Sequence, residues 1–172
     1  STLNSILSDK DIKHVILSMT WYRDNYTNIS GELFSADELA GAIIDTINQL
    51  KKSGKSVSVM SPIAIPNFSI ASELPRKFKF NHLSLIDIKE KTYIDRKIFD
   101  SKFNNINNKL KSYLGNNYIE VFDDLCDSNH CYFAKDKIMY FADSDHLSQY
   151  SLKFLNGTQA KIARVLVNLP IE

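Results

Sequence analysis

The sequence shows no strong excess of charge of either sign. Its 21 lysine and arginine residues face 20 aspartate and glutamate residues, so the net charge is +1. This balance argues against a dedicated nucleic-acid-binding protein, which usually carries a basic excess. The chain also lacks any run of about 18 apolar residues, the length that crosses a bilayer. A composition of 44% hydrophobic and 24% charged residues is close to the globular average. It excludes a disordered tail, a collagen-like repeat and a coiled coil.

Cysteine is scarce, with Cys126 and Cys131 as the two cysteines of the chain. Together with the nearby His130 they are too few for a structural zinc site, which has four ligands. The short loop between them closes as a disulfide if the two Cα atoms lie within about 7 Å. Two buried free thiols are the alternative, and the spacing alone leaves both open. An exported protein would favour the disulfide.

Short apolar runs alternate with helical patterns, which is the signature of βαβ units and of an α/β fold. Four runs have the length of a short or buried strand. They are residues 14–19, 56–60, 118–122 and 137–141. The length, and the absence of repeats or a linker, predict a single domain over residues 1–172.

Three longer helices are predicted from capping residues and apolar spacing. The first begins at a capping box after Ser35 and ends before Gly54. The second has apolar residues at three- and four-residue steps over residues 94–114. The third follows Ser148 as its N-cap and is interrupted by Gly157.

Polar side chains cluster in the turn before this last helix. Asp143 and His146 are three residues apart, so in a tight turn the carboxylate can hold Nδ1 of the imidazole and leave Nε2 facing outward as a base. Asp145 is adjacent to His146, and neighbouring side chains seldom face each other, so Asp143 is the better partner. An exposed acidic turn that caps a helix is the alternative. These three residues could also collect a divalent cation, but no further ligand is apparent, and we expect no metal and no cofactor.

The residues around this turn, YFADSDHLS at 140–148, resemble the last block of the SGNH hydrolases. More narrowly, they are similar to the SGNH domain fused to membrane acyltransferases of the acyltransferase-three family. Three further segments agree in the same order: VILSMTW at 15–21, GKSVSVMSPIAIP at 54–66 and DLCDSNHC at 124–131. The resemblance covers about residues 12–168. It implies a three-layer αβα fold with a mostly parallel sheet, as in flavodoxin-like proteins, and it makes His146 and Asp143 the base and orienter of a Ser-His-Asp triad.

The chain departs from the family pattern in four places. The Gly-Asp-Ser block that carries the nucleophile and the second block, whose glycine helps to form the oxyanion hole, are both absent. Thr20 stands where an arginine is common, and Ser151 stands where a glycine is common. Either the chain is the C-terminal part of a larger protein and lacks the first strands, or it is a relative that has lost catalysis. The absence of an initial Met and the intact Asp143–His146 pair favour the first. Ser18 and Ser61 follow strands but lack the glycine neighbours of an exposed nucleophile.

The resemblance implies an O-acyltransferase of cell-envelope glycans, such as lipopolysaccharide O-antigen. Its membrane domain would bring the acyl donor across the inner membrane, and the SGNH domain would act on a glycan acceptor in the periplasm or another extracytoplasmic space. We expect the chain alone to be inactive, and the exported location favours a Cys126–Cys131 disulfide. A carbohydrate esterase is one alternative. A non-catalytic glycan-binding module is another, in which Trp21, Tyr22 and Tyr26 would stack on a sugar; packing is the plainer role for these aromatic residues.

The strand at residues 14–19 has a further consequence. In related doubly wound folds the nucleophile's strand lies beside it, so without that neighbour its edge carries unpaired backbone groups. The segment is apolar and has no Lys or Pro in its middle. We therefore expect this edge to be covered by a second copy of the chain, by residues 1–10 or by a segment outside this sequence.

Overall fold

The computed structural model describes residues 2–18, 26–27, 30–66, 92–136 and 138–167. Within it the chain forms two compact units that are interleaved in sequence. The first unit consists of Ser1–Pro62, Phe103–Glu120 and Ala160–Glu172, and the second of Ile63–Lys102 and Val121–Gln159. The single-domain organisation stays a prediction.

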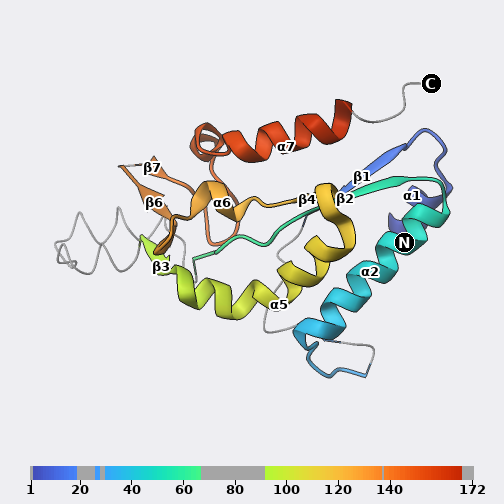
Figure 1. Ribbon diagram of the computed structural model, residues 1–172, viewed down its shortest axis with the longest axis horizontal. Coiled ribbons are helices and arrows are strands. Elements are labelled where there is room, and N and C mark those ends of the chain that lie inside the picture. The colour runs from blue at the N-terminus through green and yellow to red at the C-terminus, as the bar shows by residue number, and fades with distance from the viewer. Residues whose placement is uncertain (1, 19–25, 28–29, 67–91, 137, 168–172) are drawn as a thin grey trace. The chain divides into compact units, whose positions relative to one another are not determined.

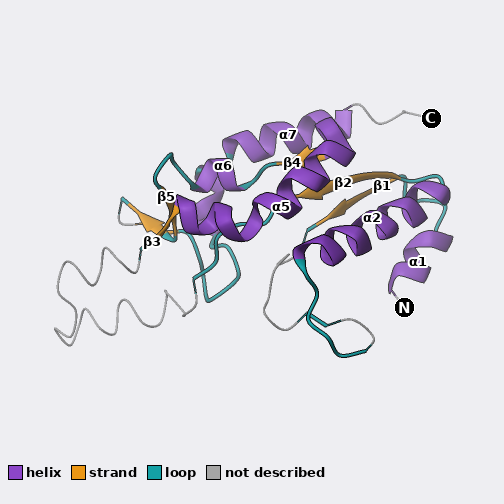
Figure 2. Ribbon diagram, turned by 60° about the horizontal axis from the view of Figure 1, so that its bottom comes forward, coloured by secondary structure: helices purple, strands orange, loops and turns teal. Residues whose placement is uncertain are grey.

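The first unit is built on a parallel sheet. Strands β1 (His14–Leu17), β2 (Ser56–Met60) and β4 (Tyr118–Ile119) lie in the order β1-β2-β4. β1 pairs with β2 from His14 to Leu17, and the end of β2 pairs with β4. Within this unit the Figure 1 and Figure 2 views place α2 and the end of α5 on one side of the strands and the end of α7 on the other. The α/β class with a parallel sheet is therefore confirmed.

Helix α2 (Ala36–Lys52) shows how the local sequence sets this unit. The Ser35 hydroxyl accepts the backbone N–H of Glu38, and the Glu38 carboxylate accepts the backbone N–H of Ser35, so the predicted capping box forms. Five apolar side chains of one α2 face are buried: Leu39, Ala40, Ile43, Ile47 and Leu50. Val57 and Val59 of β2 are buried as well, which gives the unit a continuous apolar core.

The second unit contains two small antiparallel pairs in place of a large sheet. β3 (Tyr93–Asp95) pairs with β5 (His130–Tyr132), and β6 (Ala134–Lys135) pairs with β7 (Ile138–Met139). A short helix, α6 (Phe122–Leu125), precedes β5, and a 3₁₀ helix, η2 (Gln149–Lys153), follows the polar turn. Tilted or edge-on aromatic pairs, Phe99 with Phe122 and Phe133 with Phe141, form its core.

The remaining helices complete the described chain. α1 (Thr2–Ser8) buries no residue; α5 (Arg96–Leu114) and α7 (Asn156–Val167) each contribute to both units, and a 3₁₀ turn, η1 (Gly115–Asn117), leads into β4. None of the helices in the described ranges is long and apolar enough to cross a membrane.

Several predicted boundaries are wrong, and tertiary pairing explains most of them. The strand predicted at 118–122 ends at Ile119, because Phe122 enters α6. Within the short strand or extended stretch predicted at 137–141, the strand β7 covers Ile138–Met139, and it pairs with β6 in a hairpin. Gly157 lies in the first turn of α7 and does not interrupt it.

β1 is an edge strand of the parallel sheet, as predicted if a neighbouring strand is absent. β1 occupies one end of the strand order, so no strand in the described part of the chain pairs with its outer edge. Residues Thr2–Ser8 form helix α1 and do not add a strand there. A covering strand would therefore have to come from a second copy or from another segment.

Candidate active site

The polar turn is the loop of a β-hairpin in the second unit. Phe141 bridges Leu147; the Ala142 N–H donates to the His146 carbonyl oxygen at 2.8 Å, and the Ser148 N–H donates to the Tyr140 carbonyl oxygen at 2.8 Å. Asp143, Ser144 and Asp145 are thus a three-residue loop, a common hairpin connection. His146 is the first residue after this loop.

Asp143 organises the backbone of the loop. Its Oδ1 atom accepts the backbone N–H groups of Asp145 at 2.9 Å and of His146 at 2.7 Å. A carboxylate that closes a turn in this way gives the chain an alternative to regular pairing and fixes the loop. These backbone hydrogen bonds therefore fix the position of His146 relative to Asp143, independently of the contact between the carboxylate and the ring.

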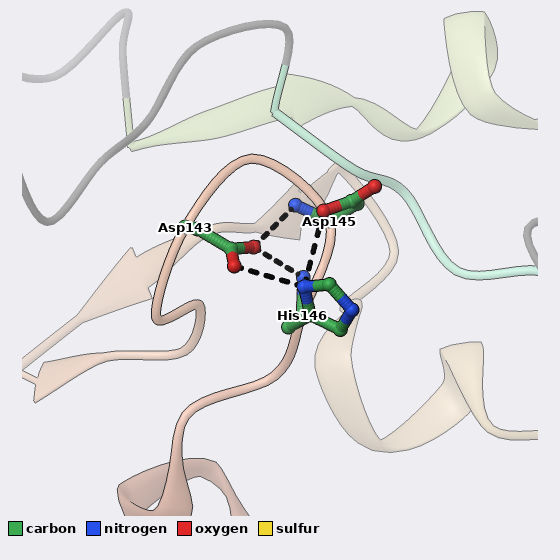
Figure 3. Close-up of side chains that lie close together, drawn as sticks. All are labelled: Asp143, Asp145 and His146. Atoms are coloured by element: carbon green, nitrogen blue, oxygen red, sulfur yellow. Dashed lines mark hydrogen bonds and ion pairs between the residues drawn. The ribbon is translucent and has the colours of Figure 1, made fainter.

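The second oxygen of the same carboxylate meets the imidazole. Nδ1 of His146 lies 2.8 Å from Oδ2 of Asp143, and Figure 3 shows the other ring nitrogen turned away from the carboxylate. The Asp145 and His146 backbone donors and the His146 ring hold the pKa of Asp143 far below its usual range. The carboxylate is thus ionised at neutral pH, and it favours the tautomer with a proton on Nδ1.

This geometry suits a general base. With the proton of neutral His146 held on Nδ1, Nε2 carries the lone pair that can accept a proton. The His146 side chain is 77% exposed, so a reactant can reach the ring from solvent. The spacing of three residues predicted this juxtaposition; the catalytic role of the pair stays a prediction.

Asp145 lies closer to the imidazole than its position in the sequence predicts. Its Oδ1 atom lies 3.2 Å from Nδ1 of His146, although the two residues are adjacent in sequence. The hairpin loop folds back on itself and turns both carboxylates toward the ring (Figure 3). The composition of the loop, two acids around one serine, was the available signal.

The same three side chains could hold a cation. Asp143, Asp145 and His146 offer one ligand atom each within 4.8 Å of one another. Carboxylate and imidazole ligands suit several divalent metals. A cation on Nδ1 would replace the proton that Asp143 holds there, so metal binding and the oriented-base arrangement exclude each other.

The cysteine loop belongs to the same unit. Cys126 and Cys131 form a disulfide with their Cα atoms 4.0 Å apart. Asp127 lies within the loop, and its Oδ1 atom accepts the backbone N–H groups of Asn129 and His130, both at 2.8 Å. The loop is therefore closed covalently and braced by one carboxylate.

The other residues considered from the sequence either belong to the first unit or lie outside the described residues. Trp21 lies outside the described residues, as do Thr20 and Tyr22. Ser61 is buried and Ser18 is exposed, and both belong to the first unit, whereas His146 belongs to the second.

Comparison with protein families now identifies the chain. The model of the family described as SGNH domain (fused to AT3 domains) matches residues 1–158. The chain belongs to this family, and it is an acyltransferase-associated SGNH module. A search of curated proteins found no match, and neither did a search of solved structures.

Proposed function

We propose that the chain supplies the base and its orienting carboxylate to an O-acyltransferase that acetylates cell-envelope glycans, such as lipopolysaccharide O-antigen, outside the cytoplasm. The observation that carries this proposal is the 2.8 Å contact between Nδ1 of His146 and Oδ2 of Asp143. Membership of the family fused to AT3 domains supports a membrane acyltransferase domain as the partner that presents the acyl donor.

The reaction proceeds in two steps on a serine outside these 172 residues. In the first, Nε2 of His146 removes the serine proton, the serine oxygen attacks the acyl carbonyl, and the protonated His146 returns the proton to the leaving group. The carboxylate of Asp143 stabilises the imidazolium that forms in between. Backbone N–H donors hold the negative charge on the carbonyl oxygen.

The second step transfers the acyl group to the acceptor. Nε2 of His146 deprotonates a sugar hydroxyl, whose oxygen attacks the acyl-serine ester. The bond between the carbonyl carbon and the serine oxygen breaks, and the protonated His146 returns the proton to the serine. If water takes the place of the sugar, the same groups perform ester hydrolysis. Transferase and esterase therefore differ in the acceptor and share the base.

The test compares His146→Ala with His130→Ala in the full-length protein. His130 is the matched control because it belongs to the same unit and has Asp95 3.8 Å from its Nε2 atom. We expect His146→Ala to abolish formation of acylated glycan and His130→Ala to retain it. Equal activity of the His146→Ala protein and the wild type would contradict the proposal.

Two measurements separate this function from its alternatives. Acylated sugar and free acid, measured together with donor and acceptor present, distinguish a transferase from an esterase by which product dominates. A glycan-binding module would bind glycan without any turnover that depends on His146.

A further inference from the structure

A small cavity opens beside the hairpin that carries His146. It has a volume of about 190 Å³ and lies wholly within the second unit. Its walls come from α6 and the disulfide loop, from β5, β6 and the residue after β6, from Tyr140, and from Phe154 after η2. Sites for drug-sized ligands measure about 300–1,000 Å³, so this cavity has room for a single sugar ring, and the rest of a longer glycan would lie outside it.

The hairpin register relates the cavity to His146. Tyr140 lines the cavity and pairs with Ser148, while Ala142 pairs with His146. Residues two apart on a strand point to the same face and are separated by about 7 Å along it. Tyr140 and His146 therefore share one face of the hairpin, with the Phe141–Leu147 pair between them.

The walls combine aromatic rings with hydrogen-bonding groups. Tyr132, Tyr140 and Phe154 supply the rings, and the Tyr140 and Phe154 rings are 4.9 Å apart between centroids. The Lys135 ammonium lies 4.3 Å from the centre of the Tyr132 ring. Aromatic faces pack against the C–H faces of a pyranose, while the Lys135 ammonium and the Asp136 carboxylate can bond its hydroxyls, so this lining fits a sugar better than an acyl chain.

The carboxylate of Asp127 is fixed before any ligand arrives. Its Oδ2 atom accepts the Tyr132 hydroxyl at 2.5 Å, and its Oδ1 atom accepts two backbone N–H groups of the disulfide loop. Asp136, the residue after β6 in the β6–β7 hairpin, has φ of 51°. This is the one positive φ of a non-glycine residue in the described chain. A left-handed backbone is common for aspartate in the tight turn of a β-hairpin, and Asp136 directly follows β6 in such a turn.

The charge of the lining selects among sugars. Three acidic residues, Asp124, Asp127 and Asp136, and one basic residue, Lys135, line the cavity, so its charged lining residues sum to −2 from 3 acids and 1 base. An anionic group brought among them is repelled.

We propose that this cavity binds one neutral or amino-sugar ring of the glycan acceptor and rejects rings that carry a carboxylate or a phosphate. The proposal rests on the proposed acyl transfer to a glycan, because it places this ring next to the hydroxyl that His146 deprotonates.

The test measures binding to the full-length protein by ligand-observed saturation-transfer NMR. The probes are methyl glucoside and glucosamine as neutral and amino sugars, with glucuronate and glucose 6-phosphate as anionic ones. We expect binding of the first two and none of the last two. Preferential binding of the anionic probes, or no binding of any probe, would overturn the proposal.

Charge reversal locates the binding site. Asp136→Lys should lower the affinity ratio of glucosamine to glucuronate by about tenfold or more, because two units of charge change a few ångströms from the ligand. Asp95→Lys is the control: Asp95 is 63% exposed in the same unit and does not line the cavity. An equal shift in both variants would show a general charge effect and contradict the site.

One further variant separates this inference from the proposed function. His146→Ala should abolish acyl transfer and leave sugar binding within about twofold of the wild type. If His146→Ala abolishes acyl transfer but the wild type binds no sugar, the proposed sugar site is wrong and the proposed function stands. Sugar binding that responds to Asp136→Lys, with transfer independent of His146, would overturn the function and also the part of the inference that joins the ring to His146.

Discussion

One carboxylate, that of Asp143, holds both the backbone and the ring of His146. Oδ1 accepts the His146 backbone N–H at 2.7 Å, and Oδ2 lies 2.8 Å from Nδ1 of the ring. The two oxygens have separate roles, since Oδ1 closes the hairpin loop and Oδ2 orients the imidazole. A substitution that keeps the first role and removes the second therefore tests the orienting role alone.

Asp143→Asn is that substitution. Asparagine keeps an amide oxygen for the backbone N–H groups but loses the anion that holds the Nδ1 proton. We expect a melting temperature within a few degrees of the wild type and a fall in acyl transfer of about 10³–10⁴-fold, the loss typical when a triad imidazole takes the wrong tautomer. Thermal melts and transfer rates of the full-length protein check both. Asp145→Asn is the control and should retain at least a tenth of the activity; a more active Asp143→Asn protein would refute the assignment.

The 172-residue chain alone should turn over no acetyl ester. Its sequence has no Gly-Asp-Ser block, and Ser61, which directly follows β2, is buried. The measurement is hydrolysis of a small chromogenic acetate at neutral pH, compared with buffer. Turnover that disappears in the His146→Ala protein would contradict the expectation and would make Ser18 and Ser61 the next residues to substitute.

The disulfide should form in material purified without reductant. Closing so short a loop stabilises the fold by about 2–3 kcal/mol in the chain-entropy account. We expect no free thiol in denaturing titration, and a lower free energy of unfolding for the Cys126→Ser/Cys131→Ser double variant. Two titratable thiols in unreduced wild-type protein would refute the bridge and weaken the proposal of an exported domain.

The start of α7 depends on Asp124, a residue of the same compact unit that is far from α7 in the sequence. Asp124 Oδ1 accepts the Gly157 N–H at 3.2 Å, and Oδ2 accepts the Thr158 N–H at 2.6 Å and its hydroxyl at 2.7 Å. A Cβ at position 157 would stand 2.7 Å from Asp124 Oδ1. This contact is closer than real Cβ atoms show, so alanine there displaces the cap.

Gly157→Ala should therefore destabilise the protein. Alanine is favoured over glycine in a helix by about 1 kcal/mol, but a lost cap costs about 1–2 kcal/mol and the displacement of Asp124 adds to it. Chemical denaturation of Gly157→Ala, Asp124→Ala and the double variant measures the coupling. We expect the double variant to be less destabilised than the sum of the two singles; a more stable Gly157→Ala protein would contradict the steric argument.

The sequence predicted the features that depend on residues close to one another along the chain. The Ser35–Glu38 box starts α2, and the three-residue spacing brings His146 to Asp143, because each involves groups within one turn. The signals failed where a distant partner decides. The Asp124 cap on α7 spans more than thirty residues, and no periodicity in residues 137–141 distinguishes a β6–β7 hairpin from a strand of the main sheet.

The family itself was predictable, since short motifs in a fixed order survive changes elsewhere. Asp145 was missed as a neighbour of the ring because its approach depends on the backbone path of a three-residue loop. The cavity beside Tyr140 was invisible for a related reason. Its walls come from four separate segments, which the fold alone brings together.

The last prediction concerns the outer edge of β1. This strand pairs with β2 on one side, and no strand in the described chain pairs with it on the other. Its four residues, His14–Leu17, include three aliphatic ones and no lysine or proline, so the edge is a template for another strand. We propose that two copies of the 172-residue chain pair these edges in an antiparallel, two-fold dimer. Light scattering should give the mass of a dimer at about 100 μM, and Leu17→Lys should give a monomer because charge blunts an edge. Leu33→Lys changes another apolar residue, 62% exposed and in the same unit, and should leave the dimer intact. A monomeric wild-type chain would refute the pairing, and a dimer that persists in Leu17→Lys and dissociates in Leu33→Lys would place the interface elsewhere.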